Sequence, residues 1–371
     1  MKRRQFVAGA ATVTSAALAS AAQPGAAALP KNHPGRDYKP GKAVMRLGCQ
    51  SGPMTDERLN YFKRHGVDHI NGYPEQLPGG GFNLESMKRL VEMCGKHGLT
   101  LDMIQFPLPS SYIAKAQMPS IMMGKPERDR DIDTCCQIVR DAAAAGIPAL
   151  KYNMTILGVL STEPTLGRGG IMQRSWDLAK AKQDPPLTEA GAAPAEVMWE
   201  RITYFLKRVV PVANEYKVRL ACHPHDPGVP KSGFRGVDRV LGTVDGLKKF
   251  VSIEESPYHG LNFCQGTVSE MLQDPGKEIN DVIRFFGKKQ KIFNVHFRNI
   301  RGKRDKFVET YPDEGDVDFF KAMMTYKEVG YPYMMMPDHM PRHAGDPGTR
   351  EAFAWAYGYI KALIQVAQRS A

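Results

Sequence analysis

The sequence predicts an α/β protein, a single-domain (β/α)8 TIM barrel that covers residues 44–371. Short runs of high β-propensity alternate along the chain with longer segments of helical periodicity, which is typical of parallel βα units. Eight segments of each kind can be counted, and eight is the number of units in this barrel. The chain of 371 residues is long enough for one such domain.

The predicted strands are short apolar runs, and glycines such as Gly98, Gly146 and Gly330 end several of the helices that follow them. In chain order the strands cover residues 44–49, 68–71, 100–105, 149–153, 218–223, 261–264, 292–297 and 333–336. The helices cover residues 55–65, 84–97, 129–145, 195–216, 244–251, 277–287, 317–329 and 349–369. The stretch 157–194 is rich in Gly, Pro and Thr, and we expect an extended loop there, on the catalytic face.

The N-terminus has the composition of an export signal. Lys2, Arg3 and Arg4 precede an apolar stretch, and small residues at 19–21 and 26–28 fit a cleavage site. Adjacent arginines before a phenylalanine resemble a twin-arginine signal. We therefore expect residues 1–30 to be a signal peptide of this type, residues 31–43 to be a linker, and the mature protein to be periplasmic or secreted.

The bulk composition is that of a soluble globular protein, with 42% hydrophobic and 24% charged residues. The net charge of +11 falls to about +8 without the three basic signal residues. No basic run with interleaved aromatic residues is present, so we expect no nucleic-acid partner. We also expect no membrane association after signal removal. The sequence leaves open whether the protein is a homo-oligomer.

Side chains of types that commonly bind metals stand at the ends of four consecutive predicted strands. They are His223, Cys264, His296 and Asp338. In a (β/α)8 barrel the active site lies at the C-terminal ends of the strands, so these four side chains are expected to meet there. Two imidazoles, one thiolate and one carboxylate suit a divalent metal such as Mn²⁺, Fe²⁺, Co²⁺, Ni²⁺ or Zn²⁺.

Each of these residues also has an ordinary structural interpretation. A single histidine after a strand is more often a hydrogen-bonded surface residue, and a single cysteine is more often a core residue. An aspartate such as Asp338 could cap a helix. The joint pattern favours the metal site, because all four residues stand at the same end of neighbouring strands.

Several motifs in the chain resemble those of the mannonate dehydratase family. They are Ala221-Cys222-His223-Pro224, Gly260-Leu261-Asn262-Phe263-Cys264-Gln265-Gly266, His296-Phe297-Arg298-Asn299-Ile300 and Pro337-Asp338-His339. Less specific matches include Arg128-Asp129, Lys151-Tyr152-Asn153, Glu309 and Gly315-Asp316-Val317-Asp318. The likeness runs in order from about residue 44 to residue 345.

The resemblance implies a xylose-isomerase-like TIM barrel that uses a divalent metal, usually Mn²⁺, to dehydrate D-mannonate to 2-keto-3-deoxy-D-gluconate. It assigns the four residues above to the metal and His339 to acid/base catalysis. Arg298 is expected to act in catalysis by pairing with the substrate carboxylate. Asn153, His225 and Asn299 are expected to contact the small sugar-acid substrate.

This mechanism is chemically consistent. A metal that holds the carboxylate and the neighbouring oxygen stabilises the enediolate formed when the C2 proton leaves. Histidine changes charge near neutral pH, so His339 could protonate the departing C3 hydroxyl.

The sequence departs from the family at two places. His225-Asp226 replaces an Asp-Asp pair, and Phe353 stands near the place of a family tyrosine, for which Tyr357 or Tyr359 could substitute. Two alternatives therefore stay open. One is a metal-dependent isomerase, epimerase or eliminase acting on an oxidised sugar in the periplasm, and the other is a sugar-binding protein without catalysis.

Overall fold

The computed structural model describes residues 43–77, 82–181, 187–230 and 233–370. The predicted signal peptide, 1–30, lies outside these described residues, and so does the predicted linker, 31–43, except for its last residue. None of the helices within the described ranges combines the length and apolarity that a membrane crossing requires.

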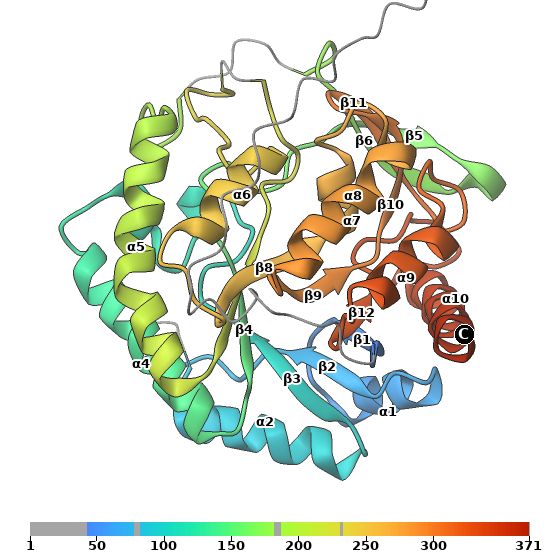
Figure 1. Ribbon diagram of the computed structural model, residues 1–371, viewed down its shortest axis with the longest axis horizontal. Coiled ribbons are helices and arrows are strands. Elements are labelled where there is room, and N and C mark those ends of the chain that lie inside the picture. The colour runs from blue at the N-terminus through green and yellow to red at the C-terminus, as the bar shows by residue number, and fades with distance from the viewer. Residues whose placement is uncertain (1–42, 78–81, 182–186, 231–232, 371) are drawn as a thin grey trace, which may run out of the picture. The chain divides into compact units, whose positions relative to one another are not determined.

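Eight parallel strands close into a barrel, which confirms the predicted fold class (Figure 1). The strands are β1 (Arg46–Gln50), β2 (His69–Gly72), β3 (Thr100–Gln105), β4 (Ala149–Asn153), β7 (Arg219–His223), β8 (His259–Cys264), β9 (Ile292–His296) and β12 (Met334–Met336). They are hydrogen-bonded in the order β1-β12-β9-β8-β7-β4-β3-β2. Each corresponds to one predicted strand, with small shifts at the ends.

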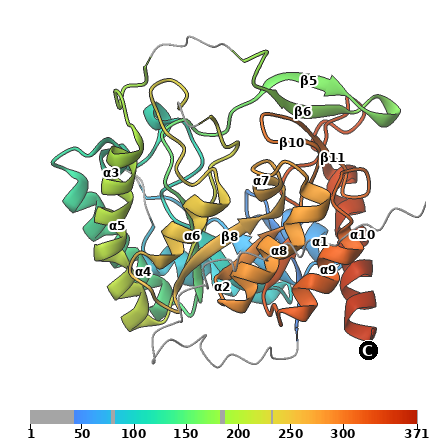
Figure 2. The ribbon, with the colours of Figure 1, turned by 45° about the horizontal axis from the view of Figure 1, so that its top comes forward.

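Helices surround the barrel on its outside (Figures 1 and 2). They are α1 (Asp56–Arg64), α2 (Leu84–Lys96), α4 (Arg128–Ala144), α5 (Ala195–Tyr216), α6 (Val244–Ser252), α8 (Pro275–Lys288), α9 (Phe319–Glu328) and α10 (Arg350–Arg369). Shorter elements are α3 (Pro119–Met123), α7 (Gln265–Ser269), η1 (Ile113–Lys115) and η2 (Arg168–Gly170). Thr55 caps α1, since its hydroxyl accepts from the Arg58 N–H.

Alternation along the barrel strands separates an apolar outer core from the barrel interior. On β4, Leu150 and Tyr152 belong to the large core under the helices, whereas Ala149 belongs to a small cluster in the interior. Because side chains alternate along a strand, Lys151 and Asn153 share the inward side of Ala149. The lower interior is apolar, and the interior near the C-terminal ends of the strands is polar.

A second sheet lies over the C-terminal ends of the barrel strands (Figure 2). It consists of β5 (Thr162–Leu166), β6 (Met172–Asp177), β10 (Asn299–Lys303) and β11 (Lys306–Thr310), in the order β10-β11-β6-β5. The expectation that 157–194 is an extended loop was therefore wrong for its first part, which forms a β-hairpin. Antiparallel pairing of β6 with the distant β11 completes this sheet, and local patterning does not reveal such pairing.

The second sheet has its own small core. Trp176 of β6 is 2% exposed and packs with Ile300, Phe307 and Val229, which connects the sheet to the loop after β7. This packing positions Arg174 on β6 and Glu309 on β11 above the barrel. We predict that Trp176→Ala destabilises this sheet by about 3 kcal/mol, because it leaves a cavity in a core with few other contacts.

Hydrogen exchange measured by mass spectrometry would locate the effect of this substitution. Protection should fall in β5, β6, β10 and β11 while the barrel strands stay protected. The control is Trp355→Ala on α10, whose side chain is 39% exposed. A uniform loss of protection across the barrel would show that the second sheet does not fold as a separate unit.

Candidate active site

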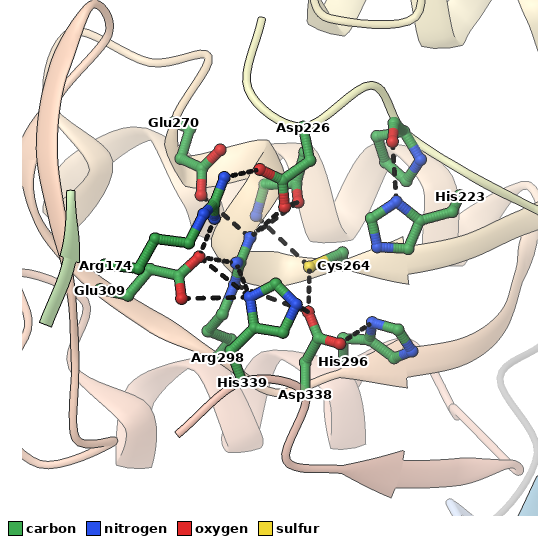
Figure 3. A network of polar contacts seen from close by, with 12 residues as sticks. Arg174, His223, Asp226, Cys264, Glu270, His296, Arg298, Glu309, Asp338 and His339 are labelled. Carbon is green, nitrogen blue, oxygen red and sulfur yellow. Dashed lines mark hydrogen bonds and ion pairs between the residues drawn. The ribbon is translucent and has the colours of Figure 1, made fainter. Parts of the chain in front are cut away.

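The four predicted metal ligands meet at the C-terminal ends of the barrel strands (Figure 3). One ligand atom from each of His223, Cys264, His296 and Asp338 lies within 4.8 Å of every other. Strand register explains part of this, because Cys264 of β8 is directly opposite His296 of β9. Asp338 follows β12, the neighbour of β9 on the other side.

Hydrogen bonds orient the two imidazoles toward the centre of this group. Nδ1 of His223 lies 2.7 Å from the Pro224 carbonyl, so it carries the proton and leaves Nε2 free. Nε2 of His296 lies 3.2 Å from Oε1 of Gln50. The other nitrogen of His296, Nδ1, is buried without a hydrogen bond and lies 3.1 Å from Asp338. A metal held by both Nδ1 of His296 and the carboxylate of Asp338 would use these two facing atoms as ligands.

The electrostatics of the group also fit a cation. Burial lowers the pKa of both His223 and His296, which keeps the rings neutral, as metal ligands must be. Burial acts to raise the pKa of Asp338, but His296 and His339 lower it well below its ordinary value. Burial raises the pKa of Cys264. The thiol is therefore protonated until a cation displaces its proton.

His339 lies beside this group and is the most accessible residue of the cluster, with a side chain 38% exposed. Its Nδ1 is 3.1 Å from both oxygens of Glu309. Burial acts to lower the pKa of His339, but Asp338 and Glu309 raise it above its ordinary value. Glu309 favours the protonated form of the ring, and Nη1 of Arg298 lies 2.9 Å from the same Nδ1 and acts against it. Nε2 lies 3.8 Å from Asp338, on the side of the four predicted ligands.

Arg298 is 2% exposed and lies inside a cluster of carboxylates (Figure 3). Its terminal nitrogens donate to Glu309, to Asp226 and to Glu270. Arg174 of β6 contacts two of the same carboxylates, Asp226 and Glu309. Both terminal nitrogens of Arg298 are thus occupied by the chain itself, which differs from the direct contact with substrate that we expected.

Carboxyl groups outnumber the guanidinium groups inside this cluster. Burial raises the pKa of Glu270 well above its ordinary value, whereas Arg298 and Arg174 act to lower it. Burial acts to raise the pKa values of Asp226 and Glu309, but Arg174 and Arg298 lower both, that of Glu309 to about 2. The two guanidinium groups therefore face Asp226, Glu309 and Glu270, and neither arginine retains an unbalanced charge for a substrate.

The three residues expected to contact substrate lie in different surroundings. Asn153 lines a cavity at the barrel mouth and donates to the Leu108 carbonyl at 3.3 Å. His225 uses both ring nitrogens on the backbone, at Met154 and Leu241. Asn299 donates to the carbonyls of Pro312 and Val317. Of these three, only Asn153 faces the cavity.

Several residues of the site were not predicted from the sequence. The cavity beside the metal ligands has a volume of about 160 Å³, and its walls include Gln50, Tyr73, Gln105 and Lys151. The signal for Lys151 was available, since it is two residues from Asn153 and therefore on the same side of β4. No local signal identified Arg174, because its position depends on the long-range pairing of β6 with β11.

The aromatic residues of α10 lie away from this cavity. Tyr357 is 1% exposed and packs against Tyr61 and Phe62 of α1. Phe353 packs against Tyr357 on the same helix. Tyr359 stacks on Trp355. The ring contacts of Tyr357 and Tyr359 thus belong to the packing around α10, which accounts for both without a catalytic role.

All six cysteines are buried and unpaired. This agrees with the absence of any compact disulfide spacing in the sequence. Cys222 and Cys264 lie on neighbouring strands but face opposite ways, because Cys222 belongs to the core under the helices and Cys264 to the barrel mouth.

Comparisons of the sequence with known proteins find similarity to mannonate dehydratases. Residues 187–368 match the family model described as D-mannonate dehydratase (UxuA). A mannonate dehydratase from Thermotoga petrophila is 28% identical over 312 residues, which cover 74% of this chain and 82% of that protein. Mannonate dehydratase 2 from Halalkalibacterium halodurans is 26% identical over 328 residues, covering 80% of this chain and 90% of that protein.

A solved structure has the same fold. The crystal structure of mannonate dehydratase from Streptococcus suis serotype 2 superposes with a TM-score of 0.74 at 24% identity. The match covers 89% of this chain and 96% of that chain. A D-tagatose 3-epimerase-like protein matches with a TM-score of 0.55 at 16% identity, which shows a related barrel.

The site predicts that metal binding depends on one cysteine and not on its neighbour. Cys264→Ala should remove a ligand and lower the affinity for the metal by at least about tenfold. The metal content of the purified protein should then fall from about one ion per chain to a small fraction. Cys222→Ala is the matched control and should keep the metal. Elemental analysis measures both variants, and equal metal contents would contradict the assignment of Cys264.

The carboxylate cluster predicts a specific loss of stability in acid. The pKa of Glu309 is lowered from 4.5 to about 2, so its ionised form stabilises the fold above about pH 4.5. This contribution is lost as the pH falls toward 2. Glu309→Gln should therefore flatten the dependence of unfolding free energy on pH in this range.

Urea denaturation at a series of pH values measures this effect, and Glu351→Gln on the exposed face of α10 serves as the control. The same slope in wild type and Glu309→Gln would mean that Glu309 has an ordinary pKa in the folded protein.

Proposed function

Since this chain is a relative of the mannonate dehydratases, we propose that it is a hydro-lyase that dehydrates D-mannonate or a closely related aldonate. One observation carries the proposal. A set of two imidazoles, a thiol and a carboxylate lies directly beside an accessible histidine whose pKa is raised. This arrangement combines a metal site with a proton donor, which are two of the functions that loss of water from a hydroxy acid requires, beside a base that takes the C2 proton.

The metal would be held by His223, Cys264, His296 and Asp338. The mixed donor set admits Mn²⁺, which we propose as the native ion, and Fe²⁺, Co²⁺, Ni²⁺ and Zn²⁺ are its competitors. When bound, the ion would stabilise the negative charge that develops on the oxygens of the acid as the C2 proton leaves.

His339 would supply the proton that the departing C3 hydroxyl needs. Its ring is held through Nδ1 by Glu309, so Nε2 is the nitrogen that delivers the proton. Glu309 is itself kept ionised by Arg298 and Arg174. The two arginines thus act on the reaction through Glu309 and His339. The C2 proton passes to a base, and the resulting enol becomes the 2-keto acid when a proton adds to C3 and the enol hydroxyl loses its own proton.

We also propose that the protein is exported, on the basis of Arg3, Arg4 and the apolar stretch that follows them. Cell fractionation of a tagged chain would place it in the periplasm or the medium. Replacing both arginines by lysine should retain it in the cytoplasm, because the twin-arginine route requires the arginine pair. Export of the double variant would contradict this route.

The reaction is tested by incubating the metal-loaded protein with D-mannonate and measuring the mass of the product. Loss of one water identifies the dehydratase, and a product of unchanged mass would favour an isomerase or epimerase instead. His339→Asn should lower turnover by at least about a hundredfold, because it removes the proton donor. It should retain the metal and bind the substrate.

The matched control is His343→Asn, which changes an exposed histidine four residues away and should leave turnover unchanged. If His339→Asn keeps full activity, His339 is not the proton donor and the mechanism proposed above is wrong.

A further inference from the structure

A single charged residue lines the cavity beside the metal ligands. Among the described residues of its walls, which include Gln50, Tyr73, Gln105 and Asn153, only Lys151 carries a charge. The volume of about 160 Å³ is below the roughly 300–1,000 Å³ of pockets for drug-sized ligands, so the cavity suits a small metabolite. A lone cation in such a cavity indicates an anionic ligand.

Strand geometry places Lys151 in this cavity. On β4 it is paired in register with Gln105 of β3 and with Ala221 of β7. Ala221 and the neighbouring Ala149 both belong to the interior cluster of the barrel, so Lys151 lies on the same inward side, nearer the mouth. The position is therefore determined by two neighbouring strands and not by a loop.

The ammonium group of Lys151 has no partner among the described residues. Lys151 is 5% exposed, yet its Nζ takes part in no ion pair and in no hydrogen bond within the described ranges. Burial lowers the pKa of Lys151 to about 8, while Asp338 and Cys264 act to raise it. The group is thus mainly charged at neutral pH. The Nζ of Lys151 is not among the fully buried atoms that lack a partner, so it is open to the cavity. A charge held there with little exposure and no counter-charge in contact is costly, and a bound anion would offset that cost.

The other buried lysine shows the usual arrangement. Lys291, at the opposite end of the barrel, is 1% exposed, and its ammonium contacts Glu255 at 2.8 Å and the Ser256 carbonyl at 2.7 Å. Lys151 lacks both kinds of contact. The difference indicates that its partner is supplied from outside the chain.

The other two cationic side chains near the predicted metal ligands, Arg298 and Arg174, already contact carboxylates of the chain. Arg298 and Arg174 face Asp226 and Glu309, and the terminal nitrogens of Arg298 are all in use. A carboxylate that entered the cavity would therefore meet Lys151 as its free cationic partner there. The amide nitrogen of Gln105, which is 9% exposed, has no acceptor either. It can donate to an oxygen of the same ligand.

We propose that Lys151 binds the carboxylate of the substrate and that this contact makes the site selective for sugar acids over neutral sugars. Gln105 and Asn153 border the same cavity and would contact the hydroxyl groups. The inference rests on the proposed function, because it assumes an aldonate substrate. It adds a residue that recognises the charge of that substrate, whereas the terminal nitrogens of Arg298 contact carboxylates of the chain.

The test compares a sugar acid with its neutral amide. Calorimetry would measure the binding of D-mannonate and D-mannonamide to metal-loaded wild type and to Lys151→Met. Wild type should bind the acid more tightly than the amide. In Lys151→Met the affinity for the acid should fall about 10- to 100-fold, as expected for a charge-assisted hydrogen bond. The affinity for the amide should fall by less than about threefold.

Two further variants control for the loss of a buried lysine. Lys151→Arg should restore part of the preference for the acid, because it keeps the charge. Lys291→Met removes the buried lysine at the other end of the barrel and should leave the preference unchanged. Thermal unfolding of each variant shows whether it is folded, and Lys151→Gln replaces Lys151→Met if the latter is not.

The inference is overturned if the acid and the amide lose affinity equally in the Lys151 variants, or if wild type does not prefer the acid. Failure of the proposed function is a separate result. A wild type that binds D-mannonate but does not dehydrate it would contradict the reaction, and the comparison of acid with amide would still decide the role of Lys151. If D-mannonate does not bind, D-gluconate and its amide are compared in the same way. If neither acid binds, both the inference on Lys151 and the proposed function are overturned.

Discussion

The closed parallel barrel is the constraint on which the site depends. Because side chains alternate along each strand, every second residue of eight strands is forced into one shared interior. In this chain that interior is apolar around Ala149 and Ala221 and polar toward Asn153 and His223, which are paired in register nearer the mouth. Strand register therefore brings the predicted metal ligands and the cavity lysine together, although more than a hundred residues separate His223 from Asp338 in the sequence.

A second constraint comes from the buried arginines. Arg298 is 2% exposed, and it stays charged because the carboxylates around it offset the free-energy cost of removing its guanidinium group from water. One of these carboxylates, Glu309, is on β11 of the second sheet, and Arg174 of β6 joins the same cluster. The second sheet is thus held to the barrel mouth by ion pairs, and through Glu309 it determines how His339 is oriented.

The sequence was sufficient for the barrel and for the convergence of the four predicted metal ligands, but not for what surrounds them. His223, Cys264, His296 and Asp338 were identifiable because each stands at the end of a strand whose pattern is local. Arg298 and Asn299 belong to the same motif as His296, yet their side chains contact the chain itself, and motif membership alone does not reveal orientation. The β5–β6 hairpin was missed because its strands are mostly polar and pair with a segment more than a hundred residues away.

The distribution of charge at the barrel mouth connects the two parts of the proposed reaction. Asp338 and the thiolate of Cys264 would match the charge of a bound divalent ion, and the two arginines face Asp226, Glu309 and Glu270. What remains is the ammonium of Lys151 and the proton on His339, whose pKa is raised. The ammonium of Lys151 would bind a carboxylate, and the proton of His339 would leave with the C3 hydroxyl group as water. A neutral sugar would leave the buried charge of Lys151 without a partner, so the same balance that allows dehydration of an acid disfavours the binding of neutral sugars.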